Sequence, residues 1–159
     1  MRTEEDRMND RELTPAEAKE GAEKTLEVVP FVALGTCGTD GWPDVRMMAV
    51  AAREGVETLW FGTSKETKKI AQLKANPKTV IYGFDPATMR EFRLFGRVEM
   101  RTDAESRRKV WRDEFLRYFP EGVDSPTLVV LRFVTEHGEY ASLGEGMGKF
   151  CQGSEGVKE

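Results

Sequence analysis

The sequence lacks most of the side chains that build metal centres, disulfide frameworks and catalytic triads. It contains one histidine, His137, and two cysteines, Cys37 and Cys151, among 159 residues. These three residues have neither the spacing of metal ligands nor the partners of a Ser–His–Asp triad. The phosphate loop of nucleoside triphosphatases is also absent. We therefore expect no metal site and no catalytic acid, base or nucleophile from the protein itself.

Long apolar runs are absent as well. No stretch of about 18 apolar residues occurs, so the sequence predicts no membrane span. Residues 1–7 are highly charged and lack the apolar centre of a signal peptide, which makes the cytoplasm the expected location. The net charge is −4, from 24 basic and 28 acidic residues, and an acidic chain argues against a nucleic-acid partner. A hydrophobic content of 39% at this length indicates one folded domain.

Composition divides the chain into three parts. We predict a disordered polar lead-in at 1–13, a folded domain at 14–142 and a Gly-rich flexible tail at 143–159. The domain should open with a helix at Thr14-Pro15-Ala16-Glu17, because Thr can cap a helix while Pro and Glu suit its first and third positions. This helix should run to about residue 27.

Six segments have the composition of β-strands. Short turns such as Thr39-Asp40-Gly41 join them, so antiparallel pairing is expected, with the first three strands pairing in chain order. Gly96 should make a bulge in the fifth strand. The predicted strands are residues 31–37, 43–51, 56–62, 79–84, 91–100 and 127–134, and residues 139–142 can extend the sheet.

Two more helices are predicted between the strands. Thr63-Ser64-Lys65-Glu66 matches a capping box, and a short basic helix should follow and end at Asn76-Pro77. A second capping box at Thr102-Asp103-Ala104-Glu105 should start an amphipathic helix with an aromatic stripe, which ends before Pro120. These elements together predict an antiparallel barrel or sandwich with helices outside.

The basic helix carries the clearest chemical signal. Residues 65–78 hold five Lys and one Glu. Helix-start amides and ammonium groups favour an anion such as a phosphate, although a solvated Lys-rich face explains the same pattern equally well. Arg46, on a strand of the first hairpin, can grip a phosphate with two parallel donors. We therefore predict that Arg46, Thr67, Lys68 and Lys69 hold one dianionic phosphate.

A flat heterocycle could lie beside this phosphate. The strand backbone at Met47 and Met48 offers donors and acceptors to such a ring, and Phe61 and the Met side chains could pack against its apolar part. Six segments in fixed order then match a known pattern: Gly41-Trp42-Pro43, Arg46-Met47-Met48, Leu59-Trp60-Phe61-Gly62-Thr63, Thr67-Lys68-Lys69, Phe95-Gly96-Arg97-Val98-Glu99 and Tyr118-Phe119-Pro120-Glu121-Gly122.

Over residues 14–142 the chain resembles the FMN-binding split-barrel superfamily, in its pyridoxamine-phosphate-oxidase-like group and the bacterial general stress proteins within it. The resemblance implies a mainly β (α+β) fold, a six-stranded antiparallel split β-barrel with flanking helices. It also implies a homodimer with two flavin sites at its interface. The implied FMN-binding residues are Arg46, Met47, Met48, Ala49, Phe61, Gly62, Thr63, Thr67, Lys68 and Lys69.

The implied activity is that of an FMN-dependent oxidoreductase acting on a small molecule that the sequence does not identify. Three alternatives stay open: a flavin-storing stress protein without dedicated turnover, a deazaflavin-binding barrel, and a cofactor-free dimeric module. Two departures from the family matter. Glu91 stands roughly where the true oxidases have a flavin-contacting Gln, and their C-terminal substrate-binding segment is not recognisable. Vitamin B6 synthesis is therefore not predicted.

Overall fold

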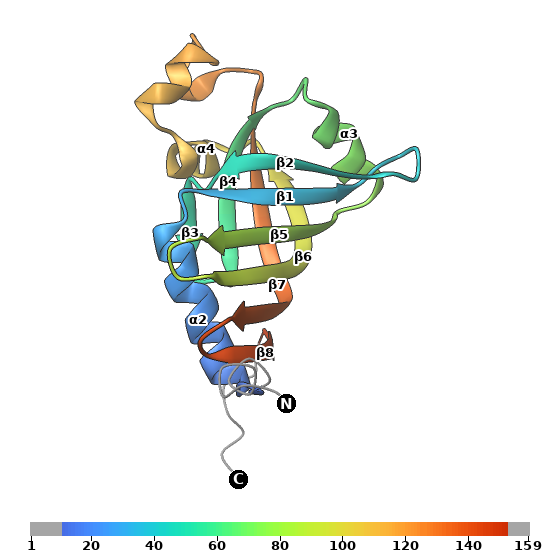
Figure 1. The fold of residues 1–159 in the computed structure, drawn as a ribbon. Helices are drawn as coiled ribbons and strands as arrows, with labels where there is room; N and C mark the ends of the chain where they lie inside the picture. Colours follow the sequence, from blue (N-terminus) through green and yellow to red (C-terminus); the bar gives the residue numbers. More distant parts are fainter. Residues whose placement is uncertain (1–10, 153–159) are drawn as a thin grey trace.

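The computed structural model describes residues 11–152, so the predictions for residues 1–10 and 153–159 lie outside it. One curled antiparallel sheet dominates, in the order β2-β1-β5-β6-β7-β4-β3, with β8 paired to β7 (Figure 1). Its strands are β1 (Phe31–Cys37), β2 (Pro43–Ala49), β3 (Ala52–Glu54), β4 (Thr58–Ser64), β5 (Lys78–Asp85), β6 (Arg90–Arg101), β7 (Leu128–Ser142) and β8 (Gly146–Cys151). The helices are α2 (Pro15–Val28), α3 (Lys68–Ala75) and α4 (Ala104–Val110), with 3-10 turns η1 (Asp113–Arg117) and η2 (Gly122–Asp124).

The mainly β antiparallel fold with flanking helices is confirmed, but the sheet has eight strands within the described residues, where six were expected. One added strand, β8, lies in the segment expected to be a flexible tail. Its glycines are the reason that it can pack. A Cβ on Gly148 would lie 2.9 Å from the Ala18 side chain of α2, so only a residue without a side chain fits this closely. The lead-in is also partly ordered, because Glu12 forms a bridge with Met147.

The expected pairing of the first three strands in chain order is confirmed for the first and second strands and wrong for the second and third. β1 pairs with β2 and with β5, whereas β4 pairs with β3 and β7. Tight turns specify only the two local hairpins, β1–β2 and β3–β4. β4 is apolar on both faces, since Leu59 and Phe61 lie in the main core and Trp60 in a smaller cluster with Val110 and Val130. Such a strand packs best inside a sheet, here beside β7.

The bulge predicted at Gly96 is confirmed. The β6–β7 register shifts between Phe95 and Gly96. A Cβ on Gly96 would lie 2.0 Å from the Val134 carbonyl oxygen, so the strands approach here more closely than any side chain allows. β7 continues past this point through residues 139–142, as the predicted extension requires.

The helix starts follow capping chemistry in two of three cases. For α2 the capping box is confirmed: the Thr14 hydroxyl accepts from the Glu17 amide at 3.2 Å, and the Glu17 carboxylate accepts from the Thr14 amide at 3.3 Å. α4 is capped one residue later than the predicted box at Thr102, by Asp103, whose carboxylate accepts from the Ser106 amide at 3.0 Å. The box predicted at residues 63–66 is wrong, because β4 runs on to residue 64 and α3 begins only after Thr67.

The aromatic helix expected up to Pro120 is also shorter than predicted. α4 ends at Val110, and the chain continues as η1. The Arg112 guanidinium donates to the Val50 and Ala51 carbonyls at 3.1 and 2.8 Å, which holds this segment against the β2–β3 link in a non-helical path. The aromatic side chains still stack on each other: Phe115 meets Trp111 and Phe119 edge to face.

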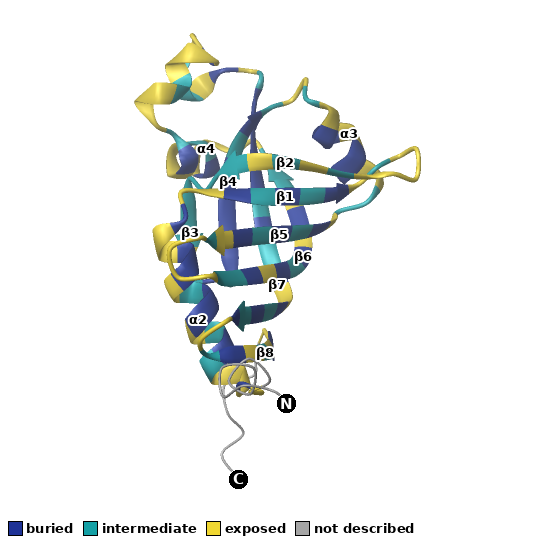
Figure 2. Cartoon of the chain, in the orientation of Figure 1, coloured by how far each residue is buried: buried dark blue, intermediate teal, exposed yellow. Residues whose placement is uncertain are grey.

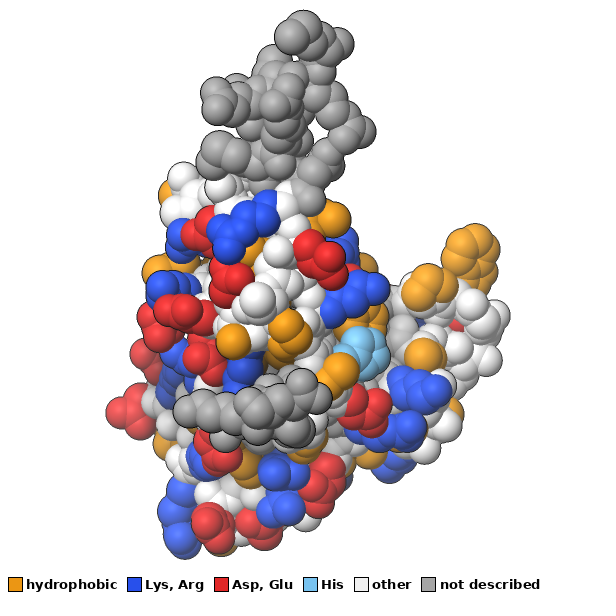
Figure 3. Space-filling model, turned by 90° about the horizontal axis from the view of Figure 1, so that it is seen from below, with side chains coloured by type: hydrophobic (Ala, Val, Ile, Leu, Met, Phe, Trp, Pro, Cys, Tyr) orange, Lys and Arg blue, Asp and Glu red, His pale blue; other side chains and the backbone are white. Residues whose placement is uncertain are grey.

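The main core lies between the curled sheet and α2. Its buried residues are the dark blue parts of the strands and of α2 in Figure 2. Its largest fully buried side chains include Tyr140, Phe61, Phe92 and Phe133. Lys and Arg are interspersed with Asp and Glu on the face seen in Figure 3. Across residues 11–152, no helix combines the length and apolar character needed to cross a membrane.

Candidate functional site

A buried ammonium group marks the candidate site. Lys69, in the first turn of α3, is only 8% exposed. Its Nζ donates to the Thr63 hydroxyl at 2.9 Å and to the Thr67 hydroxyl at 3.0 Å. An ammonium has three donors, so one remains for another acceptor. Within residues 11–152 no carboxylate pairs with this charge. Burial, and secondarily the nearby Arg46 charge, lower the pKa of Lys69 below its usual 10.5.

The start of α3 has further unused donors. Thr67 is the N-cap residue, yet its side chain does not cap the helix. Its hydroxyl instead donates to the Ser64 carbonyl at 2.9 Å and accepts from Lys69. The first-turn amides therefore have no side-chain acceptor, and the helix dipole adds partial positive charge there. The local structure thus favours an anion in front of α3.

Arg46 lies half-buried next to α3 and is held by its own network. Its Nη1 donates to the Leu34 carbonyl at 3.1 Å and to the Thr36 hydroxyl at 2.8 Å. Its Nη2 donates to the Gln72 side-chain carbonyl at 3.0 Å and lies 3.1 Å from Asp44 Oδ2. These contacts join β1, β2 and α3, so Arg46 has a structural role as well as a charge to offer.

The Asp44 carboxylate completes the cluster. Its Oδ2 accepts from Gln72 Nε2 at 3.0 Å, and Lys68 Nζ lies 3.6 Å from the same oxygen. The Gln72 hydrogen bond, followed among the favourable causes by the Arg46 and Lys68 charges, holds the pKa of Asp44 below its usual 3.8. Asp44 is therefore ionised at neutral pH. With Arg46, Lys68 and Lys69 charged as well, the cluster has a net charge of +2.

The structure thus brings together five of the predicted residues: Arg46, Thr63, Thr67, Lys68 and Lys69. Two other predicted residues face away from this cluster. Met47 lies on the outer face of β2 and is 62% exposed. Gly62 faces η1, where a Cβ would lie 2.9 Å from Phe115 Cε2. Neighbouring residues of a strand point to opposite faces, which separates Met47 from Arg46 and Gly62 from Thr63.

The remaining three predicted residues are partly or fully covered. Phe61 has no exposed surface and belongs to the main core, so its side chain cannot pack on a ligand. Met48 is half-buried against the same core, and Ala49 is half-buried at the end of β2. Because their side chains are covered, these residues can contact a ligand mainly through their backbone groups.

Sequence reasoning missed three polar residues of the cluster: Thr36, Asp44 and Gln72. Thr36 and Gln72 are 5% and 2% exposed, and the Thr36 hydroxyl donates to Gln72 Oε1 at 2.6 Å. Gln72 lies three residues after Lys69 on an otherwise apolar helix face, and such spacing was the available signal. Asp44 lies two residues before Arg46, which puts both on one face of the strand.

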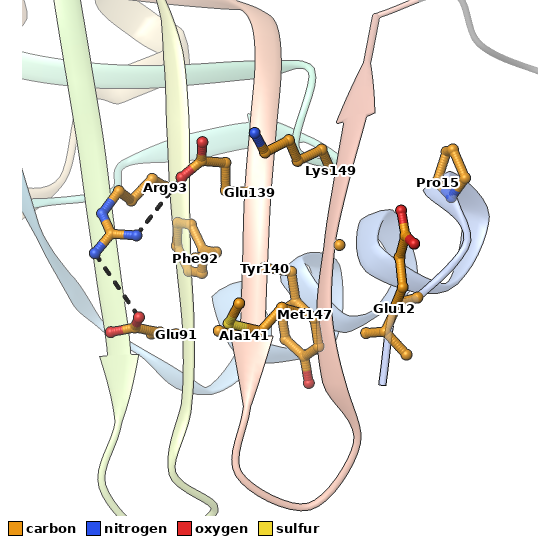
Figure 4. Close-up of a pocket in the computed structure, with 12 residues that line it drawn as sticks. Glu12, Pro15, Glu91, Phe92, Arg93, Glu139, Tyr140, Ala141, Met147 and Lys149 are labelled. Atoms are coloured by element: carbon orange, nitrogen blue, oxygen red, sulfur yellow. Dashed lines mark ion pairs between the residues drawn. The ribbon is translucent and has the colours of Figure 1, made fainter. Parts of the chain in front are cut away.

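A second cluster of charges lines an open cavity of about 500 Å³ on the outer face of β6, β7 and β8. Arg93 lies between Glu91 and Glu139, at 3.8 and 3.6 Å from their carboxylates (Figure 4). The Tyr82 hydroxyl also donates to Glu91 at 2.5 Å, which raises the pKa of Tyr82. Figure 1 places β8 and α3 at opposite ends of the molecule. One chain therefore does not bring this cavity and the α3 cluster together.

Known proteins show clear similarity to this chain. The family model for "Pyridoxamine 5'-phosphate oxidase" matches residues 18–142. None of the curated proteins matches the chain. A solved protein from Clostridium acetobutylicum, related to general stress protein 26 of B. subtilis, is 28% identical, with a TM-score of 0.73. The similarity covers 81% of this chain and 90% of that one.

Two other solved structures share the fold. A heme binding protein from Mycobacterium smegmatis is 17% identical with a TM-score of 0.69, over 84% of this chain and 57% of that one. An F420 reductase is 23% identical with a TM-score of 0.58, over 74% of this chain and 95% of that one. These two are similar in fold alone, so proteins of this fold differ in the cofactor they are named for.

Proposed function

The chain belongs to the pyridoxamine 5'-phosphate oxidase family, and we propose that it binds FMN through the phosphate at Lys69. One observation carries the proposal. Lys69 is a buried cation that lacks a carboxylate partner among the described residues, although burying an unpaired charge is costly. A bound phosphate would supply the missing negative charge and accept the third ammonium proton.

The donor set suits a phosphate monoester. The cluster of Arg46, Lys68, Lys69 and Asp44 has a net charge of +2, and a phosphomonoester is close to a dianion at neutral pH. FMN carries such a group. F420, a deazaflavin, carries its phosphate as a diester with one negative charge, so it matches the cluster less well. This charge balance is the reason that we favour FMN over the deazaflavin.

We further propose that the protein works as a homodimer. The outer face of the first hairpin exposes large apolar side chains: Trp42 at 76%, Val45 at 65%, Met47 at 62% and Phe31 at 55%. Apolar patches of this kind are typical of protein interfaces. A two-chain site would also explain why the α3 cluster and the Glu91 cavity lie at opposite ends of one chain.

The proposed activity is an oxidoreductase reaction on a small molecule. A bound flavin supplies the electron transfer, so the protein needs to bind and orient two ligands and no catalytic acid or base is required. In that role Arg46 and Lys69 would fix the phosphate, and the half-buried β2 backbone beside them would orient the rest of the cofactor. A flavin-storing protein would need the same contacts and differs only in lacking turnover.

The first experiment is reconstitution. Purified protein is incubated with FMN, riboflavin or F420 and desalted, and its visible absorption spectrum is recorded. We expect retained FMN at about one per chain and little riboflavin, because only FMN has the phosphate. Retention of F420 in preference to FMN, or of no cofactor, would contradict the proposal. Sedimentation of the same samples, with Val45→Glu/Met47→Glu as the interface variant, tests the dimer.

A further inference from the structure

Four acceptors crowd the terminal nitrogens of the Arg46 guanidinium. Nη1 donates to Leu34 and Thr36, and Nη2 donates to Gln72 and forms an ion pair with Asp44 at 3.1 Å. A phosphate that binds at these two nitrogens must therefore compete with at least one of these acceptors. The identity of the replaced acceptor decides how the site opens.

Three of the four acceptors are poor candidates for replacement. The Leu34 acceptor is a strand carbonyl, and this residue has no exposed surface. Thr36 and Gln72 are 5% and 2% exposed and bond to each other as well. Asp44 differs from them, because its side chain is 33% exposed and lies at the rim of the cluster. It is also the one charged acceptor, and its negative charge would repel an incoming phosphate.

Asp44 in fact already makes the contacts that suit a small anion. One oxygen, Oδ2, is close to donors from three side chains: Gln72 Nε2 at 3.0 Å, Arg46 Nη2 at 3.1 Å and Lys68 Nζ at 3.6 Å. The other oxygen, Oδ1, accepts from the Val45 amide at 3.0 Å. A carboxylate thus occupies the rim position where the donors of β2 and α3 converge.

Resting on the FMN-phosphate site proposed above, we propose that Asp44 is an internal competitor for the ligand's phosphate at Arg46. In the free protein its carboxylate occupies the anion position, and on binding a phosphate oxygen takes over the Arg46 Nη2 donor. A doubly charged phosphate competes better than a singly charged one, because it gains more from Arg46, Lys68 and Lys69 together. Asp44 therefore makes the site selective for phosphate monoesters, at the expense of affinity.

The test compares Asp44→Asn with a matched variant, Glu66→Gln. Both remove one negative charge near the start of α3, but Glu66 is exposed and lies outside the Arg46 network. Dissociation constants for FMN and riboflavin are measured by fluorescence quenching. We expect Asp44→Asn to bind FMN about tenfold more tightly. The phosphate then gains one charge-assisted hydrogen bond from Arg46 without competition from a carboxylate. Riboflavin binding should not change, and Glu66→Gln should alter FMN binding less than about twofold.

The opposite outcomes would overturn the inference. Equal or weaker FMN binding by a folded Asp44→Asn protein would mean that Asp44 orients Arg46 for the ligand. An equal gain in both variants would mean that only long-range charge matters. If the unaltered protein binds no FMN, the proposed function fails separately. Calorimetric titration with inorganic phosphate then decides the role of Asp44 by the same comparison of the two variants.

Discussion

Two charged regions of the molecule differ in how their charges are balanced. On the outer face of β6–β8, Arg93 lies between the Glu91 and Glu139 carboxylates, and all three side chains are partly open to solvent. At the start of α3, Arg46 and Lys68 share one carboxylate, while the buried Lys69 has no carboxylate partner among the described residues. Exposed ion pairs contribute little to stability or to binding. Unbalanced buried charge is costly, so it is the better sign of a ligand site.

The largest effect is expected from Arg46→Ala. It removes a charge from the site and also removes the guanidinium that joins Gln72 and Asp44 to β1. Breaking such a half-buried network should lower the free energy of unfolding by about 3 kcal/mol and abolish measurable FMN binding. Urea unfolding and fluorescence titration measure the two effects. Arg46→Lys is the control, because a Lys keeps the charge but cannot hold four acceptors. Full stability of the Arg46→Lys protein would contradict the stabilising role of the Arg46 network.

Lys69→Met should separate binding from stability. FMN affinity should fall at least tenfold, which is about 1.4 kcal/mol. The empty protein should melt about 2 °C higher, because an unpaired buried charge is replaced by an apolar chain of similar length. The same change at the exposed Lys68, 74% open to solvent, should leave the melting temperature unchanged. A lower melting temperature for Lys69→Met would mean that Lys69 is a structural residue.

The pH dependence of FMN binding should follow the phosphate and Lys69. Below about pH 6 the phosphate takes up a proton, so affinity should fall a few-fold between pH 7.5 and 5.5. Asp44 does not titrate in this range, since its pKa is lowered. Burial lowers the pKa of Lys69 below its usual 10.5, so as the pH rises its charge is lost earlier than that of an exposed lysine. Affinity should fall again as this charge is lost. Binding independent of pH would place the phosphate elsewhere.

The smallest effect is expected in the exposed cluster around Arg93. Arg93→Gln removes the cation between Glu91 and Glu139. We expect a change in unfolding free energy below about 0.5 kcal/mol, because exposed ion pairs are weak. Binding of inorganic phosphate, measured by calorimetry, should not change. A loss of phosphate binding would show that this cavity contributes to the anion site and would remove the distinction between the two regions.

Local patterns in the sequence predicted the parts of the fold that depend on near neighbours. The α2 capping box and the Gly96 bulge arise within a few residues and were predicted correctly. The pairing of β4 with β7 joins segments far apart in the sequence, and turn chemistry does not specify it. β8 was missed because its glycines were interpreted as flexible, although they allow the strand to lie against α2.

The site was predictable to a similar extent. Charge and helix-start chemistry pointed to Arg46 and Lys69, which the structure brings close together. The neutral residues Thr36 and Gln72 gave no such signal, because their roles arise only once α3 packs against β1. Phe61 was predicted to pack on a flat ring, but in the structure it packs in the core. Aromatic residues in a strand give no information about which face will be covered.

The length of β7 has a consequence for how the protein exchanges its amide hydrogens and folds. This strand pairs with β4 and β6 along its first half and with β6 and β8 along its second, so it belongs to both ends of the sheet. A β7 amide that is bonded to a neighbouring strand can exchange with solvent only when that strand separates. The β7 amides should be the slowest of the chain to take up deuterium, while β3 and the η1 turn exchange early. Since most partners of β7 are distant in the sequence, its pairing should also complete late in folding.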